Sequence, residues 1–197
     1  MFQNPRSCGI LPQTSALPNL PPLLPPSPSF PWPTAPVNLR RLYAYRDRCV
    51  AARIGYKLGG KARDPASFIP DFRAIDCSGW VRAAVAVSTS GRLLMPDGSM
   101  NQHDWADYHK LKVSNRAALL LPDGLLRLAF LVPSETHPIG HVFLCRNSRT
   151  LESWGGHGPG SRSVLSVISE GILQQCASAV YVLALNTLRP QTLGPDQ

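Results

Sequence analysis

The chain has no apolar stretch near the roughly 18 residues that a membrane-spanning helix needs, so we expect no membrane span. It also lacks the unbroken apolar run of a secretory signal, because proline interrupts each such run near its start. Cys8 follows Pro5, Arg6 and Ser7, whereas a lipoprotein signal would place an apolar segment before its acylated cysteine. We therefore expect no ordinary signal peptide and no lipid anchor, and the localisation stays open. Delivery by a phage or a secretion system, or another route of export, would then bring the protein to a cell envelope.

Cysteines are few, odd in number and widely separated, at positions 8, 49, 77, 145 and 176. This pattern excludes a disulfide scaffold and lacks the paired spacing of a zinc site. Cys49, Cys145 and Cys176 each lie in an apolar segment, where cysteine usually behaves as a small buried hydrophobe. The pair His103 and His109 lacks a third ligand at a suitable spacing. We expect neither a metal nor a cofactor.

Charged residues make up 16% of the chain, and Lys and Arg outnumber Asp and Glu by 20 to 12. The resulting net charge of +8 favours any anionic partner, including nucleic acid, acidic lipid or a bacterial envelope, and does not choose among them. However, the basic residues are scattered, and no basic run is interleaved with stacking aromatics. The charge pattern therefore predicts no nucleic-acid partner.

Eleven of the twenty prolines lie within the first 36 residues, which carry almost no charge and no helical periodicity. This composition predicts a polyproline-like or disordered arm over residues 1–37. The remaining length suits one domain with a sizeable core, over residues 38–190. We expect residues 191–197 to form a disordered tail.

Helical patterns occupy the first half of this domain. Apolar residues at three- and four-residue steps predict an amphipathic helix over 38–54, which ends at Gly55. A loop over 55–74 leads to Cys77, and the apolar, alanine-rich segment 80–87 predicts a helix after this cysteine. Ser99 and Gln102 have the spacing of a capping box, which predicts a further short helix.

Short apolar runs separated by Gly, Pro, Asn and Ser follow Asp123-Gly124. They predict antiparallel strands over 125–132, 142–145, 150–153, 164–168 and 179–185. The glycine-rich segment 154–160 is predicted to be a flexible loop at the edge of a cleft. Helices first and strands second indicate an α+β fold, with N-terminal helices packed on a short antiparallel β-sheet.

Cys77 differs from the other cysteines because it opens a predicted helix. A helix N-terminus favours the thiolate, which is the nucleophilic form of cysteine. The small residues Ser78 and Gly79 let a substrate carbonyl approach, and the backbone N–H of Cys77 is a candidate oxyanion donor. Cys77 is therefore the candidate nucleophile.

A thiol nucleophile needs an imidazole held within hydrogen-bond reach and a polar group that orients the imidazole ring. His141 begins a predicted strand, and the next strand offers Glu152 at a hairpin's distance. Ser153 or His157 would take the place of Glu152 if the hairpin register differed. This arrangement predicts acyl transfer from an amide to water.

The turn Asp76-Cys77-Ser78-Gly79 resembles the hallmark of the NlpC-type cell-wall cysteine peptidases. Upstream, Tyr56 with Gly59 and Gly60 is similar to the Tyr and Gly-Gly element of that family, here separated from the cysteine by an insertion around 62–72. Downstream, the strands at 123–130, 141–145 and 151–154 resemble those that supply its histidine and third polar residue. Two positions depart from the family: the strand after His141 reads Val-Phe-Leu-Cys, and Glu152 stands where many relatives carry His, Asn or Gln.

The resemblance spans about residues 38–185 and implies a papain-like cysteine hydrolase domain. It implies that Cys77, His141 and Glu152 are catalytic, and it places Tyr56, Asp76 and Ser78 on the substrate side. The implied substrate is a peptide stem of peptidoglycan, commonly cut between D-glutamate and a diamino acid.

Two other functions are compatible with the same residues. The chain could be a wall-degrading toxin or phage component, in which case an immunity or carrier protein would be its partner. It could also be a non-catalytic module that binds wall fragments. Digestion of purified wall sacculi by the native chain, but not by a Cys77→Ala variant, separates a hydrolase from the binding module.

Overall fold

The computed structural model describes residues 35–133, 135, 138–169 and 178–186. Most of the predicted arm, the predicted tail 191–197 and the residues Cys8 and Cys176 lie outside these ranges. Val37, near the end of the predicted arm, is buried and pairs with Leu185, so the packed domain already includes this residue.

The first two helices follow from their apolar spacing and their caps. Helix α1 (Leu39–Ala51) begins at Asn38, whose Oδ1 accepts a hydrogen bond from the backbone N–H of Arg41 at 3.1 Å. Leu42, Tyr45 and Cys49 form its buried face. Helix α2 (Cys77–Ser88) is buried over nearly its whole length, which explains its apolar, alanine-rich sequence.

Among the described residues, no helix combines the length and hydropathy of a membrane span.

Helix α3 (Ser99–Tyr108) exists, but the capping box predicted for it is wrong. Its N-cap residue is Gly98, at φ 86°, and no side chain caps the helix. Gln102 is instead buried, and its Nε2 donates to the carbonyl oxygens of Ser78 and Pro96, both at 2.9 Å. This side chain therefore ties α3 to the first turn of α2 and does not cap its own helix.

A six-stranded antiparallel sheet has the order β1-β6-β2-β3-β4-β5. Its strands are β1 (Lys112–Ser114), β2 (Leu126–Leu131), β3 (His141–Arg146), β4 (Arg149–Trp154), β5 (Gly158–Gly160) and β6 (Ser178–Leu183). Four of the predicted strands are present, and the predicted α+β class is confirmed. Strand β1 and the 3₁₀ helix η1 (Arg116–Leu120) were not predicted.

Two segments differ from their predictions. The predicted strand over 164–168 is wrong, because Val164–Ser169 forms the short helix α4, with Val164 and Val167 buried three residues apart. The predicted flexible loop at 154–160 is wrong for its second half, since β5 pairs with β4. Gly158 permits this pairing because a Cβ there would lie 2.2 Å from the carbonyl oxygen of Ile54.

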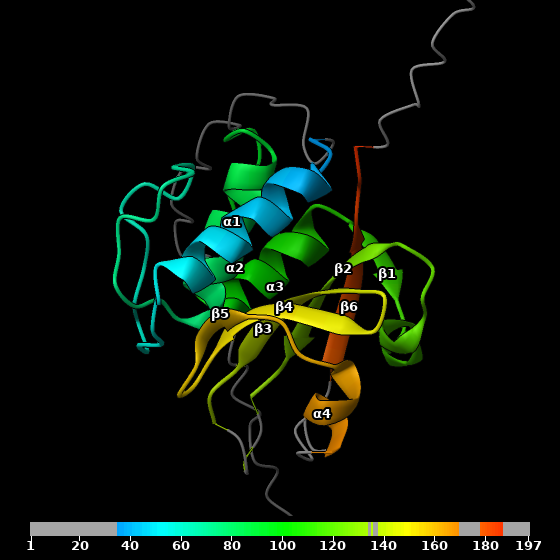
Figure 1. Cartoon of the computed structure of the whole chain (residues 1–197). Coiled ribbons are helices and arrows are strands. Elements are labelled where there is room, and N and C mark those ends of the chain that lie inside the picture. Colours follow the sequence, from blue (N-terminus) through cyan, green and yellow to red (C-terminus); the bar gives the residue numbers. More distant parts are fainter. Residues whose placement is uncertain (1–34, 134, 136–137, 170–177, 187–197) are drawn as a thin grey trace, which may run out of the picture. The chain divides into compact units, whose positions relative to one another are not determined.

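Alternate residues of the strands contribute side chains to two hydrophobic cores on opposite faces of the sheet. Leu126, Leu128 and Phe130 of β2 pack toward the helices α1, α2 and α3. Ala129 and Leu131 of the same strand join a smaller core with residues of η1 and α4. Figure 1 shows α1, α2 and α3 on one side of the sheet and α4 on the other.

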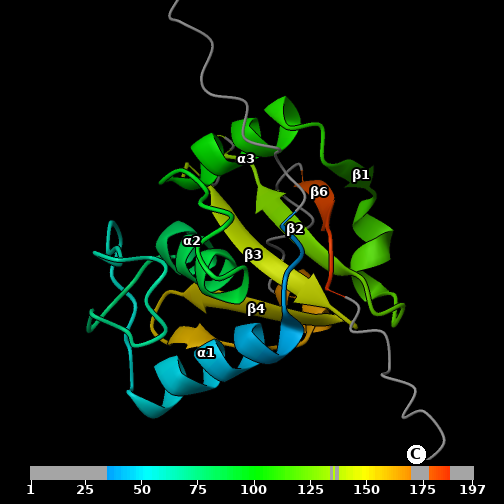
Figure 2. The same ribbon diagram turned by 90° about the horizontal axis from the view of Figure 1, so that it is seen from above.

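Helix α2 lies across β3 and β4, with α1 beside it (Figure 2). The helix that starts with the candidate nucleophile thus packs on the two strands that start with His141 and carry Glu152. This is the predicted packing of N-terminal helices on an antiparallel sheet.

Candidate active site

Cys77 is the first residue of α2, at the positive end of the helix dipole. Asp76 is the N-cap, and its Oδ1 accepts a hydrogen bond from the backbone N–H of Gly79 at 2.6 Å. Cys77 remains 6% exposed, so its environment is largely closed to water. The Cys77 sulfur is therefore held by the first turn of α2, beside backbone N–H groups that have no partner within the helix.

The carboxylate of Asp76 is the centre of a cluster that fixes the nucleophile turn. Lys61 Nζ donates to both carboxylate oxygens at 2.8 Å and to Ser78 Oγ at 2.7 Å. Ser78 Oγ donates to Asp76 Oδ1 at 3.0 Å, and the backbone N–H of Gly59 donates to Oδ2 at 3.1 Å. Asp76 and Ser78 are both buried. These two predicted substrate-side residues therefore face partners within the protein.

The Gly59-Gly60 pair is needed for this cluster because the backbone approaches closely there. The backbone N–H of Asp76 donates to the carbonyl oxygen of Gly60 at 3.1 Å. A Cβ on Gly79 would lie 2.6 Å from that same oxygen, and a Cβ on Gly60 would lie 2.8 Å from the carbonyl oxygen of Ala74. The upstream glycines thus pack directly against the nucleophile turn.

Tyr56 lies close enough to the nucleophile for the two groups to interact electrostatically. Burial raises the pKa of the Tyr56 hydroxyl, and the nearby negative charges of Cys77 and Asp76 raise it further. The phenol is half-buried. Tyr56 is therefore placed as a neutral hydroxyl beside the candidate nucleophile.

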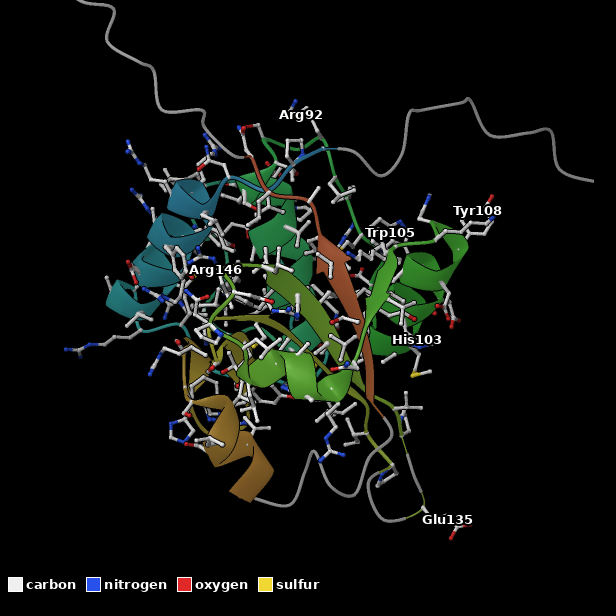
Figure 3. The ribbon with its side chains drawn as sticks, turned by 90° about the vertical axis from the view of Figure 1, so that its right-hand side faces the viewer. Arg92, His103, Trp105, Tyr108, Glu135 and Arg146 are labelled. Atoms are coloured by element: carbon white, nitrogen blue, oxygen red, sulfur yellow. The ribbon has the colours of Figure 1, made fainter. Side chains whose placement is uncertain are left out.

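His141 and Glu152 lie at the open end of the β3–β4 hairpin. The two strands pair from Arg146 with Arg149 to Leu144 with Leu151, and their ladder ends there. Figure 3 labels Arg146 at the hairpin end of β3 and Glu135 in the connection that leads into the other end, where His141 begins the strand. Both strands contact α2.

His141 Nε2 and Glu152 Oε2 are 2.7 Å apart, and Glu152 is fully buried. The other carboxylate oxygen accepts a hydrogen bond from Arg162 Nε at 2.8 Å. Because Nε2 is engaged by the carboxylate, Nδ1 is the nitrogen left to interact with Cys77, which lies close enough to raise the pKa of His141. The structure therefore brings Cys77, His141 and Glu152 together in one chain of contacts.

The pKa values of the two groups reflect these contacts. Burial by itself lowers the pKa of His141, but the hydrogen bonds and charges of Cys77 and Glu152 outweigh it and raise the pKa to about 9. Burial by itself raises the pKa of Glu152, yet the hydrogen bonds from His141, Arg162 and Thr150 hold it at about 2. Imidazolium and carboxylate thus form an ion pair around neutral pH.

The two alternatives to Glu152 have other partners. Ser153 is buried, and its Oγ donates to the carbonyl oxygen of Ile75 at 2.8 Å, which anchors β4 to the segment before Cys77. His157 is exposed and lies against Trp154, with 5.1 Å between the ring centroids. Neither side chain contacts His141 in the structure as Glu152 does.

The other described cysteines and histidines lie in different environments. Burial raises the pKa of Cys49 to about 11 and that of Cys145 to about 12, so both thiols stay protonated. His103 packs against Phe130 and Tyr181, on the side of α3 that Figure 3 shows next to the sheet. Within the described ranges, no group of three or more His, Cys, Asp and Glu side chains is arranged to hold a metal ion.

Lys61 and Arg162 are the site residues that the sequence did not predict. Each binds a buried carboxylate: Lys61 binds Asp76, 15 residues away, and Arg162 binds Glu152, 10 residues away. The adjacency of Lys61 to the Gly-Gly element is the one local signal for its position. Arg162 follows β5, a strand that the sequence did not indicate.

No family model matches this chain, and no curated protein matches it either. Among solved structures, it is similar to the peptidoglycan hydrolase RipB from Mycobacterium tuberculosis, with 19% sequence identity and a TM-score of 0.39. The similar region covers 64% of this chain and 59% of the RipB chain, which is less than two thirds of either.

Proposed function

We propose that the protein is a cysteine peptidase or amidase that cleaves peptide stems of bacterial peptidoglycan. The observation that carries this proposal is the contact chain from Cys77 through His141 to Glu152, at the N-terminus of a buried helix. A thiol, a base and a buried carboxylate in this order are the parts that acyl transfer from an amide requires.

In the proposed mechanism, the Cys77 thiolate attacks the carbonyl carbon of the amide, and the backbone N–H of Cys77 helps to hold the oxyanion. The His141 imidazolium then gives its proton to the leaving nitrogen as the C–N bond breaks. This leaves a thioester and releases an amine. His141, now neutral, takes a proton from water, and the resulting attack releases a carboxylic acid and restores the thiolate–imidazolium pair.

The surrounding residues have positioning roles in this proposal. Glu152 orients the imidazole and stabilises its protonated form. Asp76, with Lys61 and Ser78, fixes the turn that presents the sulfur. Tyr56 offers its hydroxyl to the substrate beside the nucleophile. None of these steps uses a cofactor.

The choice of substrate is supported by the Asp-Cys-Ser-Gly turn and the upstream Tyr and Gly-Gly element, which resemble the NlpC-type wall peptidases. The net charge of +8 favours the anionic envelope on which such a stem is found. An immunity or carrier protein stays a prediction, as does the route by which the chain reaches a wall.

Digestion of purified sacculi tests the proposal. We expect the native chain to release soluble muropeptides and Cys77→Ala to lose at least about 10³-fold in rate, because the covalent route is removed. Cys145→Ala is the matched control, since it removes a buried, protonated thiol and should stay active. Mass spectrometry of the products identifies the bond cut. If the native chain binds sacculi and digests none, the protein is a binding module and the proposal is wrong.

A further inference from the structure

Arg162 is held firmly at the far side of the Glu152 carboxylate. Its Nε donates to Oε1 at 2.8 Å, while His141 occupies Oε2 at 2.7 Å. Its guanidinium also lies over the ring of Trp154, 5.0 Å from the centroid. Its side chain is 15% exposed and that of Glu152 is 0% exposed, so this ion pair is largely removed from water. Such a pair differs from the surface ion pairs that contribute little.

A buried carboxylate with a titrating partner needs a second, permanent cation. In the proposed mechanism His141 alternates between imidazolium and neutral imidazole. While His141 is neutral, a buried Glu152 without another cation would be an uncompensated charge, which is strongly unfavourable. Arginine stays protonated throughout the working pH range, so Arg162 compensates Glu152 in both states.

The other ionisable groups around the pair leave the local charge balanced. Asp76, in the turn before α2, is paired with Lys61. Tyr56, from the segment after α1, and Cys145, on β3, are neutral because burial raises the pKa of each. Among the described residues, the charges of the proposed resting state then belong to the Cys77 thiolate, the His141 imidazolium, the Glu152 carboxylate and the Arg162 guanidinium. Their sum is zero.

We propose that Arg162 is a positioning residue that sets the proton affinity of the Cys77–His141 pair through Glu152. This inference rests on the proposed roles of Cys77 and His141 and adds a fourth residue to them. Without Arg162 the site carries one uncompensated negative charge. This negative charge makes the site hold its protons more tightly. The Cys77 thiolate is then protonated at a higher pH than in the native chain, and the His141 imidazolium loses its proton at a higher pH.

The pH dependence of Cys77 alkylation tests this inference without any substrate. Iodoacetamide reacts with the thiolate, and mass spectrometry of the Cys77 peptide separates it from the other cysteines. In Arg162→Gln we expect both inflections of the rate profile to rise by about one pH unit, the size expected when one charge is removed from the far side of the Glu152 carboxylate. Arg162→Lys keeps the charge and should keep the profile of the native chain.

Arg149→Gln is the matched control. Arg149 is an exposed arginine on β4 that donates to Ser161, the residue next to Arg162. Its removal should leave both inflections in place. A rate that falls equally at all pH values in Arg162→Gln would mean that Arg162 merely supports the structure, and would overturn the inference.

A double variant keeps the test decisive if Arg162→Gln fails to fold. Glu152→Gln leaves a net positive charge and should move both inflections to lower pH. Adding Arg162→Gln removes that charge together with its buried partner, a change that proteins often tolerate. The inflections should then return upward by about one pH unit. If the double variant has the same inflections as Glu152→Gln alone, the inference is wrong.

Sacculus digestion separates this inference from the proposed function. If the inflections move as expected while sacculi remain intact, the role of Arg162 stands and the substrate assignment fails. If native digestion proceeds and the inflections do not move, the function stands and the role of Arg162 fails.

Discussion

The candidate site contains two buried carboxylates, those of Asp76 and Glu152, and the groups that bind them differ in kind. Asp76 contacts the ammonium of Lys61, the hydroxyl of Ser78 and the backbone N–H groups of Gly59 and Gly79. Glu152 contacts the guanidinium of Arg162 and the imidazole of His141. Each carboxylate thus has one permanent cation. Glu152 alone of the two also touches a group that changes its charge during the proposed reaction.

The difference predicts separate roles. Partners of fixed charge make Asp76 a structural centre, whose loss should mainly lower stability. A partner that gains and loses a proton makes Glu152 part of the chemistry, so its loss should mainly lower activity. Variants at the two positions can therefore support or break this distinction.

The largest effect is expected from Glu152→Gln. The amide keeps the shape of the side chain but cannot stabilise an imidazolium, so we expect kcat on sacculi to fall by about 10³-fold, or about 4 kcal/mol of barrier. The free energy of unfolding should fall by about 3 kcal/mol, because the change leaves the largely buried Arg162 without its carboxylate. Steady-state digestion rates and urea denaturation measure the two quantities. Activity within tenfold of the native chain would show that His141 works without the carboxylate.

Much of this site follows from local sequence, and the structure shows why. Cys77 starts a helix because Asp76 can cap it, and His141 starts a strand whose hairpin partner carries Glu152. These relations extend over one turn of helix or one hairpin. Periodicity and turn residues are sufficient to predict them.

The two cations could not be predicted in this way. Lys61 meets Asp76 because the Gly-Gly backbone packs on the nucleophile turn, a contact between segments separated by a long loop. Arg162 meets Glu152 because β5 pairs Gly160 with Glu152. The sequence Gly-Pro-Gly has none of the side chains that indicate a strand. Close approach of backbone, rather than any pattern of apolar residues, places both cations.

The second effect, in order of size, is expected from Asp76→Ala. This change removes the cap of α2 and leaves Lys61 and the N–H of Gly59 without their shared acceptor. We expect the free energy of unfolding to fall by about 3 kcal/mol, as for a lost cap combined with a partly buried ion pair. Urea denaturation followed by circular dichroism measures it.

Asp97→Ala is the control for this change, because Asp97 also forms an ion pair with α2, through Arg82 at 3.2 Å, but at the surface. It should cost no more than about 0.5 kcal/mol. Equal losses at the two positions would mean that the Asp76 cluster is no more than another surface pair.

The smallest effect is expected at low pH, where protonation of Glu152 should lower the free energy of unfolding. The pKa of Glu152 in the folded chain is about 2, below the ordinary 4.5. Stability from its ionised form is therefore fully present above pH 4.5 and is lost as the pH falls through about 2. The difference in the free energy of unfolding between the native chain and Glu152→Gln should shrink across this window.

Urea denaturation of both chains at several pH values measures this difference. The pKa of Asp123 is also held at about 2, chiefly by its hydrogen bond with Arg127, so Asp123 titrates in the same window. Both chains carry Asp123, and its contribution cancels in the difference. If the difference stays constant through the window, folding does not favour the ionised form of Glu152. The buried carboxylate would then have no electrostatic role beside His141, and the distinction between the two carboxylates would fail.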